Sequence, residues 1–197
     1  MSDYHLKAAS ALGGAKHQLI QIGDYQLQEI SNLAIASVAS RTGESERVAS
    51  ILQEVLGATA PGPGTVSTGQ GGLEAFWTGP DQWMVCAPHD DRELLARELK
   101  EIFADTASIT EQNDAWVCLE VSGPDLVPVF ERLAAFDIDR FHQGSAVRTV
   151  IEHIGCFVLC METRRKVRIF AGRSFAHSLH HALKNNLTST VALQAIS

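Results

Sequence analysis

The sequence has few basic residues and no basic segment. It contains 16 Lys and Arg against 23 Asp and Glu, which gives a formal net charge of −7. A nucleic-acid-binding surface needs clustered lysines and arginines to neutralise phosphates. We therefore predict that nucleic acid is not a partner of this protein.

Long apolar runs are also absent. No run approaches the roughly 20 residues that a membrane-spanning helix requires. The start, MSDYHLKAASALGGAKHQ, lacks the basic-then-apolar order of a signal peptide. We expect no membrane partner and a cytoplasmic location.

Cysteines are few, and none forms a C-x-x-C pair. Each of the four, Cys86, Cys118, Cys156 and Cys160, lies in an apolar segment typical of a strand. Free cysteine behaves as a small hydrophobic residue and is among the residue types most often buried. We predict four buried thiols, with neither a disulfide nor a metal site.

What the sequence does contain is enough apolar material for a core, at 45% of 197 residues. Periodicity is weak in residues 1–30, which we predict to be an N-terminal arm outside the core. A domain of residues 31–187 follows, and it divides into two candidate subdomains of about 31–110 and 111–187. Residues 188–197 are then a C-terminal tail.

Strands and amphipathic helices alternate along the domain. NLAIASVAS alternates like a strand, and the helix after it, which stops at Gly57, has one apolar face of Val48, Ile51, Leu52, Val55 and Leu56. Segment 60–72 is a Gly- and Pro-rich loop. Because a helix precedes it, a strand follows it and it has no lysine, we do not expect it to bind phosphate.

The stretch FWTGPDQWMV, residues 76–85, is typical of two strands joined by a Gly-Pro-Asp turn. Pro80 suits the second position of a type I turn. The stretch therefore predicts a hairpin, in which Trp77 and Trp83 pack in the core or at a subunit interface.

A second amphipathic helix, DDRELLARELKEIFAD, follows with its inward residues Leu95, Leu99, Ile102 and Phe103. The order strand, strand, helix then recurs as ASIT, AWVCLEVS and GPDLVPVFERLAAF, with a turn at Asn113-Asp114 between the two strands and Ser122 as the helix cap. These units predict an α+β protein with antiparallel or mixed sheets and helices packed on one face.

Three more strands precede a last helix. The strands are AVRTVIEHI, CFVLCMET and KVRIFAG, and we expect Ser174 to cap the helix. The helix has a predicted buried stripe of Phe175, Leu179, Ala182, Leu183 and Leu187.

Few residues suggest chemistry. His177 and His181 are four apart on a helix and could share a metal ion, but no H-E-x-x-H pattern surrounds them and a solvated helix face explains them better. Asp137 and Asp139 flank Ile138 in a segment typical of a turn. We predict no catalytic, cofactor-binding or metal-binding residue in this chain.

Arg148 and Arg173 stand at the boundaries of predicted elements. A guanidinium group suits recognition of a carboxylate or an ion pair within an interface. A surface salt bridge of little energetic value is the open alternative. Together with Trp77, Trp83 and Phe175, these arginines are our candidate interface or structural residues.

Three separated segments, FWTGPDQWMV, FDIDRFHQGSAVRT and AGRSFAHSLHHAL, resemble in order and spacing the gamma subunit of bacterial heterotetrameric sarcosine oxidase. The resemblance covers residues 32–187. It implies a fold related to the folate-binding aminomethyltransferases, such as the T-protein of glycine cleavage. It also implies a non-catalytic scaffold subunit within a flavoprotein complex.

In such a complex the partners would be the alpha, beta and delta subunits. The resemblance implies that FAD, FMN, NAD and tetrahydrofolate belong to those subunits and that this chain binds no cofactor. The complex would oxidise sarcosine to glycine and hydrogen peroxide, with formaldehyde or methylenetetrahydrofolate as the one-carbon product.

Two other hypotheses stay open. A stand-alone folate-binding or one-carbon-transfer protein would need a pocket with an acid to pair with the pterin ring, for which the candidates are Asp81, Asp137 and Asp139. A small interaction protein without an enzymatic partner would be colourless and would bind no flavoprotein.

Overall fold

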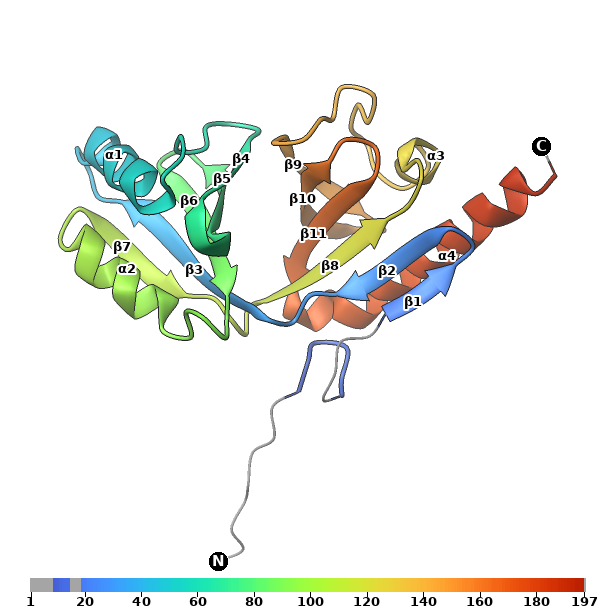
Figure 1. Cartoon of the computed structure of the whole chain (residues 1–197), viewed down its shortest axis with the longest axis horizontal. Coiled ribbons are helices and arrows are strands. Elements are labelled where there is room, and N and C mark those ends of the chain that lie inside the picture. Colours follow the sequence, from blue (N-terminus) through green and yellow to red (C-terminus); the bar gives the residue numbers. More distant parts are fainter. Residues whose placement is uncertain (1–8, 15–18, 197) are drawn as a thin grey trace, which may run out of the picture.

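The computed structural model describes residues 9–14 and 19–196, and it contains two antiparallel sheets that lie side by side (Figure 1). The five-stranded sheet has the order β4-β5-β6-β3-β7, from strands Leu33–Ser40 (β3), Val66–Thr68 (β4), Glu74–Gly79 (β5), Gln82–Pro88 (β6) and Ala107–Glu111 (β7). The six-stranded sheet has the order β1-β2-β8-β11-β10-β9, from Leu19–Ile22 (β1), Tyr25–Glu29 (β2), Trp116–Ser122 (β8), Ala146–Ile151 (β9), Ile154–Glu162 (β10) and Lys166–Gly172 (β11). The predicted α+β class is confirmed.

The sheets form the inner two layers of an α/β/β/α arrangement. Alternation along β3 sends Ala34, Ala36 and Val38 toward the helices, whereas Ile35 faces the other sheet. Where the inner faces meet, Phe76 of β5 contacts Phe157 of β10, with ring centroids 5.4 Å apart. The central strands of each sheet are therefore covered on both faces.

Helices α1 (Ser45–Leu56) and α2 (Leu95–Phe103) cover the outer face of the five-stranded sheet (Figure 1). Helix α1 buries Val48, Leu52 and Leu56 and ends at Gly57 in the left-handed conformation, as predicted. In α2 the prediction holds for three of the four inward residues. Ile102 is the exception, since it is 48% exposed.

The Gly-Pro-Asp corner is a hairpin turn, as predicted. Trp77 of β5 lies opposite Trp83 of β6, and Gly79 pairs with Gln82 across the turn. The predicted turn type is wrong, because Asp81 has a φ of +58°, whereas a type I turn needs a negative φ at that position. Aspartate tolerates this left-handed conformation better than most residues.

The six-stranded sheet is covered by α4 (Ala176–Gln194), which a short 3₁₀ turn, Arg173–Phe175 (η2), precedes. Helix α4 buries Leu179, Leu183 and Leu187 against the sheet, but Phe175 is 51% exposed and does not belong to the buried stripe. The N-cap position is Phe175, and Ser174 makes no capping hydrogen bond. The 3₁₀ turn shifts the start of the helix past the predicted cap.

The predicted helix after β8 is mostly absent. Only Val127–Phe130 (α3) is helical, with Leu126 at the N-cap position, so Ser122 is not the cap. Asp125 accepts a hydrogen bond from the backbone N–H of Val127 instead. Pro128 lies in the first turn of this helix, where proline is tolerated. The second strand-strand-helix segment also differs from the first in its strands, since β7 and β8 belong to different sheets, whereas β5 and β6 pair with each other.

The predicted N-terminal arm is wrong for residues 19–29. These residues form the strands β1 and β2, and β2 pairs with β8 in the six-stranded sheet. Tyr25 and Leu27 are fully buried. The hydrophobic periodicity of this segment was too weak to predict the strands, because β1 is a short edge strand without buried residues. Residues 1–8 and 15–18 of the predicted arm lie outside the described part of the chain.

The predicted C-terminal tail is also wrong in part, since α4 continues to Gln194. Thr190 is buried, and Gln194 donates a hydrogen bond to the hydroxyl of Tyr25.

The chain passes from the five-stranded sheet to the six-stranded sheet between residues 111 and 116. A division into separate subdomains near residue 110 stays a prediction.

The predicted loop 60–72 contains β4 and a short 3₁₀ turn, Gln70–Gly72 (η1). It also connects the sheets, because the backbone N–H of Val66 donates to the carbonyl of Gly144 and that of Ala146 donates to the carbonyl of Gly64.

Among the described residues, none of the helices has the length and apolarity needed to cross a membrane.

Candidate ligand cleft between the sheets

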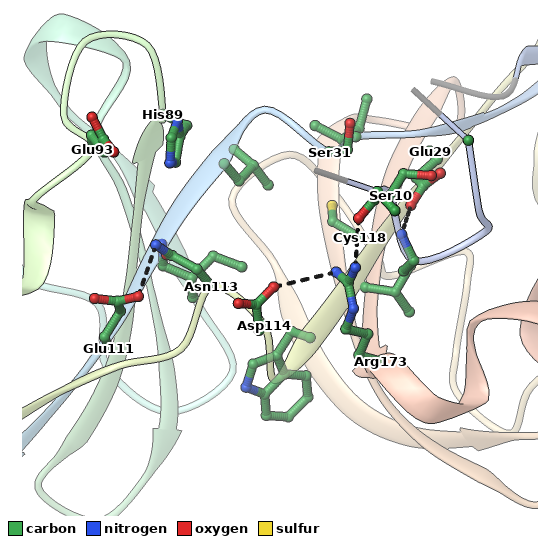
Figure 2. A pocket seen from close by; sticks show the side chains of 18 of the residues that line it. Ser10, Glu29, Ser31, His89, Glu93, Glu111, Asn113, Asp114, Cys118 and Arg173 are labelled. Atoms are coloured by element: carbon green, nitrogen blue, oxygen red, sulfur yellow. Dashed lines mark hydrogen bonds and ion pairs between the residues drawn. The ribbon is translucent and has the colours of Figure 1, made fainter. Parts of the chain in front are cut away.

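A cleft of about 520 Å³ lies at one end of the junction between the two sheets. Four segments line it, within residues 9–14, 29–35, 89–94 and 111–118, and Arg173 completes it. Figure 2 shows His89, Glu93, Glu111 and Asn113 on one side and Ser10, Glu29 and Arg173 on the other, with Asp114 between them. The volume falls in the range typical of small-molecule sites.

Glu29 is the most deeply buried charged residue of the cleft, at 1% exposed. It follows Tyr25 and Leu27 at the inward positions of β2, so the alternation of the strand points it inward. Its Oε1 accepts hydrogen bonds from the backbone N–H groups of Ala11, at 2.7 Å, and Leu12, at 3.3 Å. Its Oε2 is buried without a hydrogen-bond partner.

Arg173 also binds the N-terminal segment, residues 9–14, through the backbone of Ala9. Its Nη2 donates to the carbonyl oxygen of Ala9 at 2.7 Å, and its Nη1 lies 3.8 Å from Oδ1 of Asp114 (Figure 2). The backbone N–H of Arg173 donates to the carbonyl of Ala115. Arg173 thus joins segment 9–14, the β7–β8 turn and the start of α4.

The β7–β8 turn is held by Asn113. Its Oδ1 accepts the backbone N–H of Ile35 at 2.6 Å, and its Nδ2 donates to Glu111. The turn predicted at Asn113-Asp114 is therefore present, and it shapes one wall of the cleft.

The cleft lining combines acidic side chains with an apolar wall. Four carboxylates, from Glu29, Glu93, Glu111 and Asp114, face one guanidinium group, that of Arg173. The apolar part of the wall consists of Ile30, Leu33, Ile35, Leu94, Trp116 and Val117. Such a cleft suits a ligand with an apolar body and a few polar groups that fix its orientation.

The cysteines are poor nucleophiles. All four are buried free thiols, as predicted. Burial raises the pKa of Cys86 and of Cys118 well above the ordinary range, and it raises that of Cys156 to about 11. Cys118 lines the cleft but is held as the neutral thiol, and the thiolate is the reactive form.

Of the candidate residues from the sequence, only Arg173 lies in the cleft. Trp83 is a core residue whose Nε1 donates to the carbonyl of Pro61 at 2.8 Å, and Trp77 packs against the same core. Arg148 is exposed on the edge strand β9, with its guanidinium 5.6 Å from the ring centroid of Phe157. Phe175 is exposed at the start of α4. Roles at an interface stay predictions for these residues.

The other candidates lie outside the cleft. His181 accepts a hydrogen bond from Asn185 on the outer surface of α4, and among the described residues no three potential ligands gather to hold a metal ion. Asp137 and Asp139 occupy the predicted turn, where they pair with Arg140 and Arg164. Asp81 lies in the hairpin turn.

Sequence reasoning missed Glu29, because it lies in the segment assigned to the arm. A usable signal was present, since YQLQE alternates and places an acid at the third inward position of a strand. Asp114 was noticed as part of a turn, but its approach to Arg173 depends on the sheet arrangement.

The arrangement of strands and helices is that of the aminomethyltransferase-like fold, as comparison with solved structures shows. The chain is similar to a chain of the heterotetrameric sarcosine oxidase from Corynebacterium sp. U-96 in complex with pyrrole 2-carboxylate, with a TM-score of 0.73 and 17% identity over 84% of this chain and 85% of that chain. It is also similar to the glycine cleavage system aminomethyltransferase T from Bartonella henselae, with a TM-score of 0.61 and 14% identity over 79% of this chain.

The present chain spans 44% of the length of that aminomethyltransferase. No family model and no curated protein matches the chain by sequence. At these levels of identity the likeness defines the fold, and activity is a separate question.

Proposed function

We propose that this chain is a non-catalytic gamma-type subunit of a heterotetrameric sarcosine oxidase. Its partners are then alpha, beta and delta subunits, which hold FAD, FMN, NAD and tetrahydrofolate. The complex demethylates sarcosine to glycine and hydrogen peroxide, with formaldehyde or methylenetetrahydrofolate as the other product. A cytoplasmic location belongs to the same proposal.

The observation that carries this proposal is the extent of the structural match. The likeness to the sarcosine oxidase chain extends over most of both chains, 84% of this one and 85% of the other. The likeness to the aminomethyltransferase covers less than half of that enzyme. The fold match thus extends over most of the oxidase chain but over less than half of the transferase chain.

The chemistry of the described residues supports a scaffold role. The cysteines are neutral buried thiols, and both hairpin tryptophans contribute to the core. A charge cluster of Arg168 with Glu74 and Glu120 links the two sheets to each other. These three side chains contact one another between the sheets, so their role is to stabilise the fold.

Exposed apolar residues indicate where larger subunits could bind. Val150 is 55% exposed and lies two residues from Arg148 on β9, so both side chains share one face of the strand. Arginine beside exposed apolar residues is a common composition at the centre of interfaces. We assign this face to contact with a larger subunit.

The alternative is a stand-alone folate-binding or one-carbon-transfer protein. Its predicted acids, Asp81, Asp137 and Asp139, line neither of the two described pockets. The cleft does hold other acids, of which Glu29 is the most buried. This alternative is therefore best tested by direct binding.

The first experiment is affinity purification of the tagged full chain from its native cells. We expect a yellow complex with two larger chains and one smaller chain, which produces hydrogen peroxide when sarcosine is added. Visible absorption, mass identification of the chains and a peroxide assay are the measurements. A colourless lone protein that binds tetrahydrofolate in calorimetry would replace the proposal with the alternative.

A further inference from the structure

The cleft contains a buried acid whose bonding is incomplete. Glu29 accepts two backbone hydrogen bonds with Oε1, but Oε2 has no partner. A carboxylate oxygen that is removed from water without a compensating donor costs free energy. Native proteins keep such groups where a ligand, an ion or water supplies the missing contact.

Ser10 offers a second oxygen in the same state. Its Oγ is also buried without a hydrogen-bond partner, and Figure 2 shows Ser10 beside Glu29. Both residues line the cleft. A ligand group that donates several hydrogen bonds could satisfy the two oxygens together.

The residues around Glu29 supply no compensating positive charge. Among residues 9–14 and 19–196, no ion pair involves Glu29, and Arg173 is bonded to Ala9 and close to Asp114. His180 of α4 interacts electrostatically with Glu29, but burial, followed by the nearby Lys184, lowers the pKa of His180. The imidazole is therefore neutral at pH 7 and does not balance the carboxylate.

We propose that the cleft binds a small organic amine, whose protonated amino group contacts Oε2 of Glu29 and Oγ of Ser10. The apolar part of the amine lies on Ile30, Leu33 and Trp116. Four carboxylates against one guanidinium group give the lining an excess of negative charge, which favours a cation and disfavours an anion. This inference does not depend on the sarcosine oxidase proposal.

Binding also involves the N-terminal segment. The backbone N–H groups of Ala11 and Leu12 bind Glu29, and Leu12 is buried in the core of the six-stranded sheet. This segment covers the carboxylate, so an amine that reaches Oε2 changes the environment of both amides. These amides are local reporters of occupancy.

The test is a titration of the full chain with n-butylammonium chloride, followed by amide chemical shifts of Ala11 and Leu12 and by fluorescence of the protein's tryptophans. The matched probes are n-butanol, which has the same apolar body without the charge, and sodium butyrate, which has the opposite charge. We expect saturable shifts with the amine at millimolar concentrations and none with the other two. Equal responses to amine and alcohol, or no saturable response to the amine, would overturn the proposal.

Variants locate the site. Glu29→Gln keeps an oxygen that accepts from Ala11 and removes the charge, so it should weaken amine binding by about tenfold or more. Glu46→Gln makes the same change on the exposed surface of α1, away from the cleft, and should bind like the unaltered chain. Unchanged affinity in a folded Glu29→Gln chain would contradict the proposed contact.

A second variant covers the case in which Glu29→Gln does not fold. Ser10→Ala removes only one hydroxyl, from a residue that is half-buried as a whole, and should weaken binding several-fold. The comparison of amine with alcohol on the unaltered chain needs no variant, and it decides the charge requirement by itself.

Discussion

Arg168 on β11 and Glu74 on β5 form an ion pair between the two sheets, with Nη1 of the arginine 2.6 Å from Oε2 of the glutamate. Nε of Arg168 also donates to Glu120 on the neighbouring strand β8, at 3.0 Å. Burial by itself lowers the pKa of Arg168, but the two carboxylates outweigh this effect and raise it. The guanidinium group therefore remains charged between the sheets.

Replacement of Arg168 by methionine should destabilise the chain strongly. It leaves the buried Glu74 without its cation, which costs about 3–5 kcal/mol in comparable buried pairs, whereas the half-buried Glu120 keeps Lys166 at 3.8 Å. Urea unfolding of the isolated chain measures the change. The triple variant Arg168→Met, Glu74→Gln, Glu120→Gln should recover much of the loss. As a control, Arg97→Met removes an exposed pair with Glu101 and should have little effect. Similar losses in both single variants would contradict the assignment.

Gly69 should not tolerate a side chain. A Cβ atom at this position would overlap the backbone carbonyl of Leu56, which cannot move without displacing the end of α1. We expect Gly69→Ala to reduce the free energy of unfolding by about 2 kcal/mol or more. Gly62→Ala is the matched control in the same loop, because a Cβ there meets no atom within 4 Å. Equal stability of the two variants would show that the loop adapts.

Stability should decrease in acid partly through Asp125. Its hydrogen bond from Arg164 is the main cause of the lowered pKa of this carboxyl, with a further contribution from the N–H of Val127. Because the folded pKa is below the unfolded one, the stabilisation is present above about pH 4 and is lost as the pH falls through the folded pKa.

The effect should be small, about a few tenths of a kcal/mol, because both side chains are substantially exposed. Asp125→Asn should lower stability at pH 7 and flatten the acid limb of a plot of unfolding free energy against pH. Asp24→Asn, at a position without a recorded ion pair among the described residues, is the control. An unchanged acid limb in Asp125→Asn would rule out this contribution.

Arg148→Ala should weaken assembly with the larger subunits without unfolding the chain. The side chain is exposed and contacts the ring of Phe157, so its removal affects the surface more than the core. We expect about a tenfold weaker association, as for a moderate interface residue. Pull-down titration measures the association, and thermal unfolding checks the fold. Arg47→Ala on α1 is the control, and equal association of both variants would remove Arg148 from the interface.

The sequence predicted the five-stranded half of the fold well. The apolar spacing of α1, the stop at Gly57 and the hairpin around Pro80 are local signals, and each appears in the structure. Helix α3 was predicted too long because the apolar residues Leu133, Ala134 and Phe136 pack in a nonhelical turn region after Phe130. Local periodicity does not distinguish these two ways of burying the same residues.

The cleft could not be predicted in the same way. Glu29, Asp114 and Arg173 are far apart in the sequence, and they line one cavity only because β2 pairs with β8 and the two sheets pack together. The N-terminal strands were the critical omission. The alternation of YQLQE indicates a strand, but it does not indicate that the strand pairs with β8, about a hundred residues later in the chain.

That distant pairing has a consequence for synthesis of the chain. All strands of the five-stranded sheet lie within residues 33–111, so this sheet can form while the rest of the chain is still being made. Strands β1 and β2 are made before the five-stranded sheet, yet they cannot pair with β8 until it emerges, and α4 covers them only later still. We expect protease to cut near residues 19–29 in ribosome-bound chains that end before β8, and protection of this segment to appear only in longer chains. Two strands that are synthesised before the five-stranded sheet are thus folded after it.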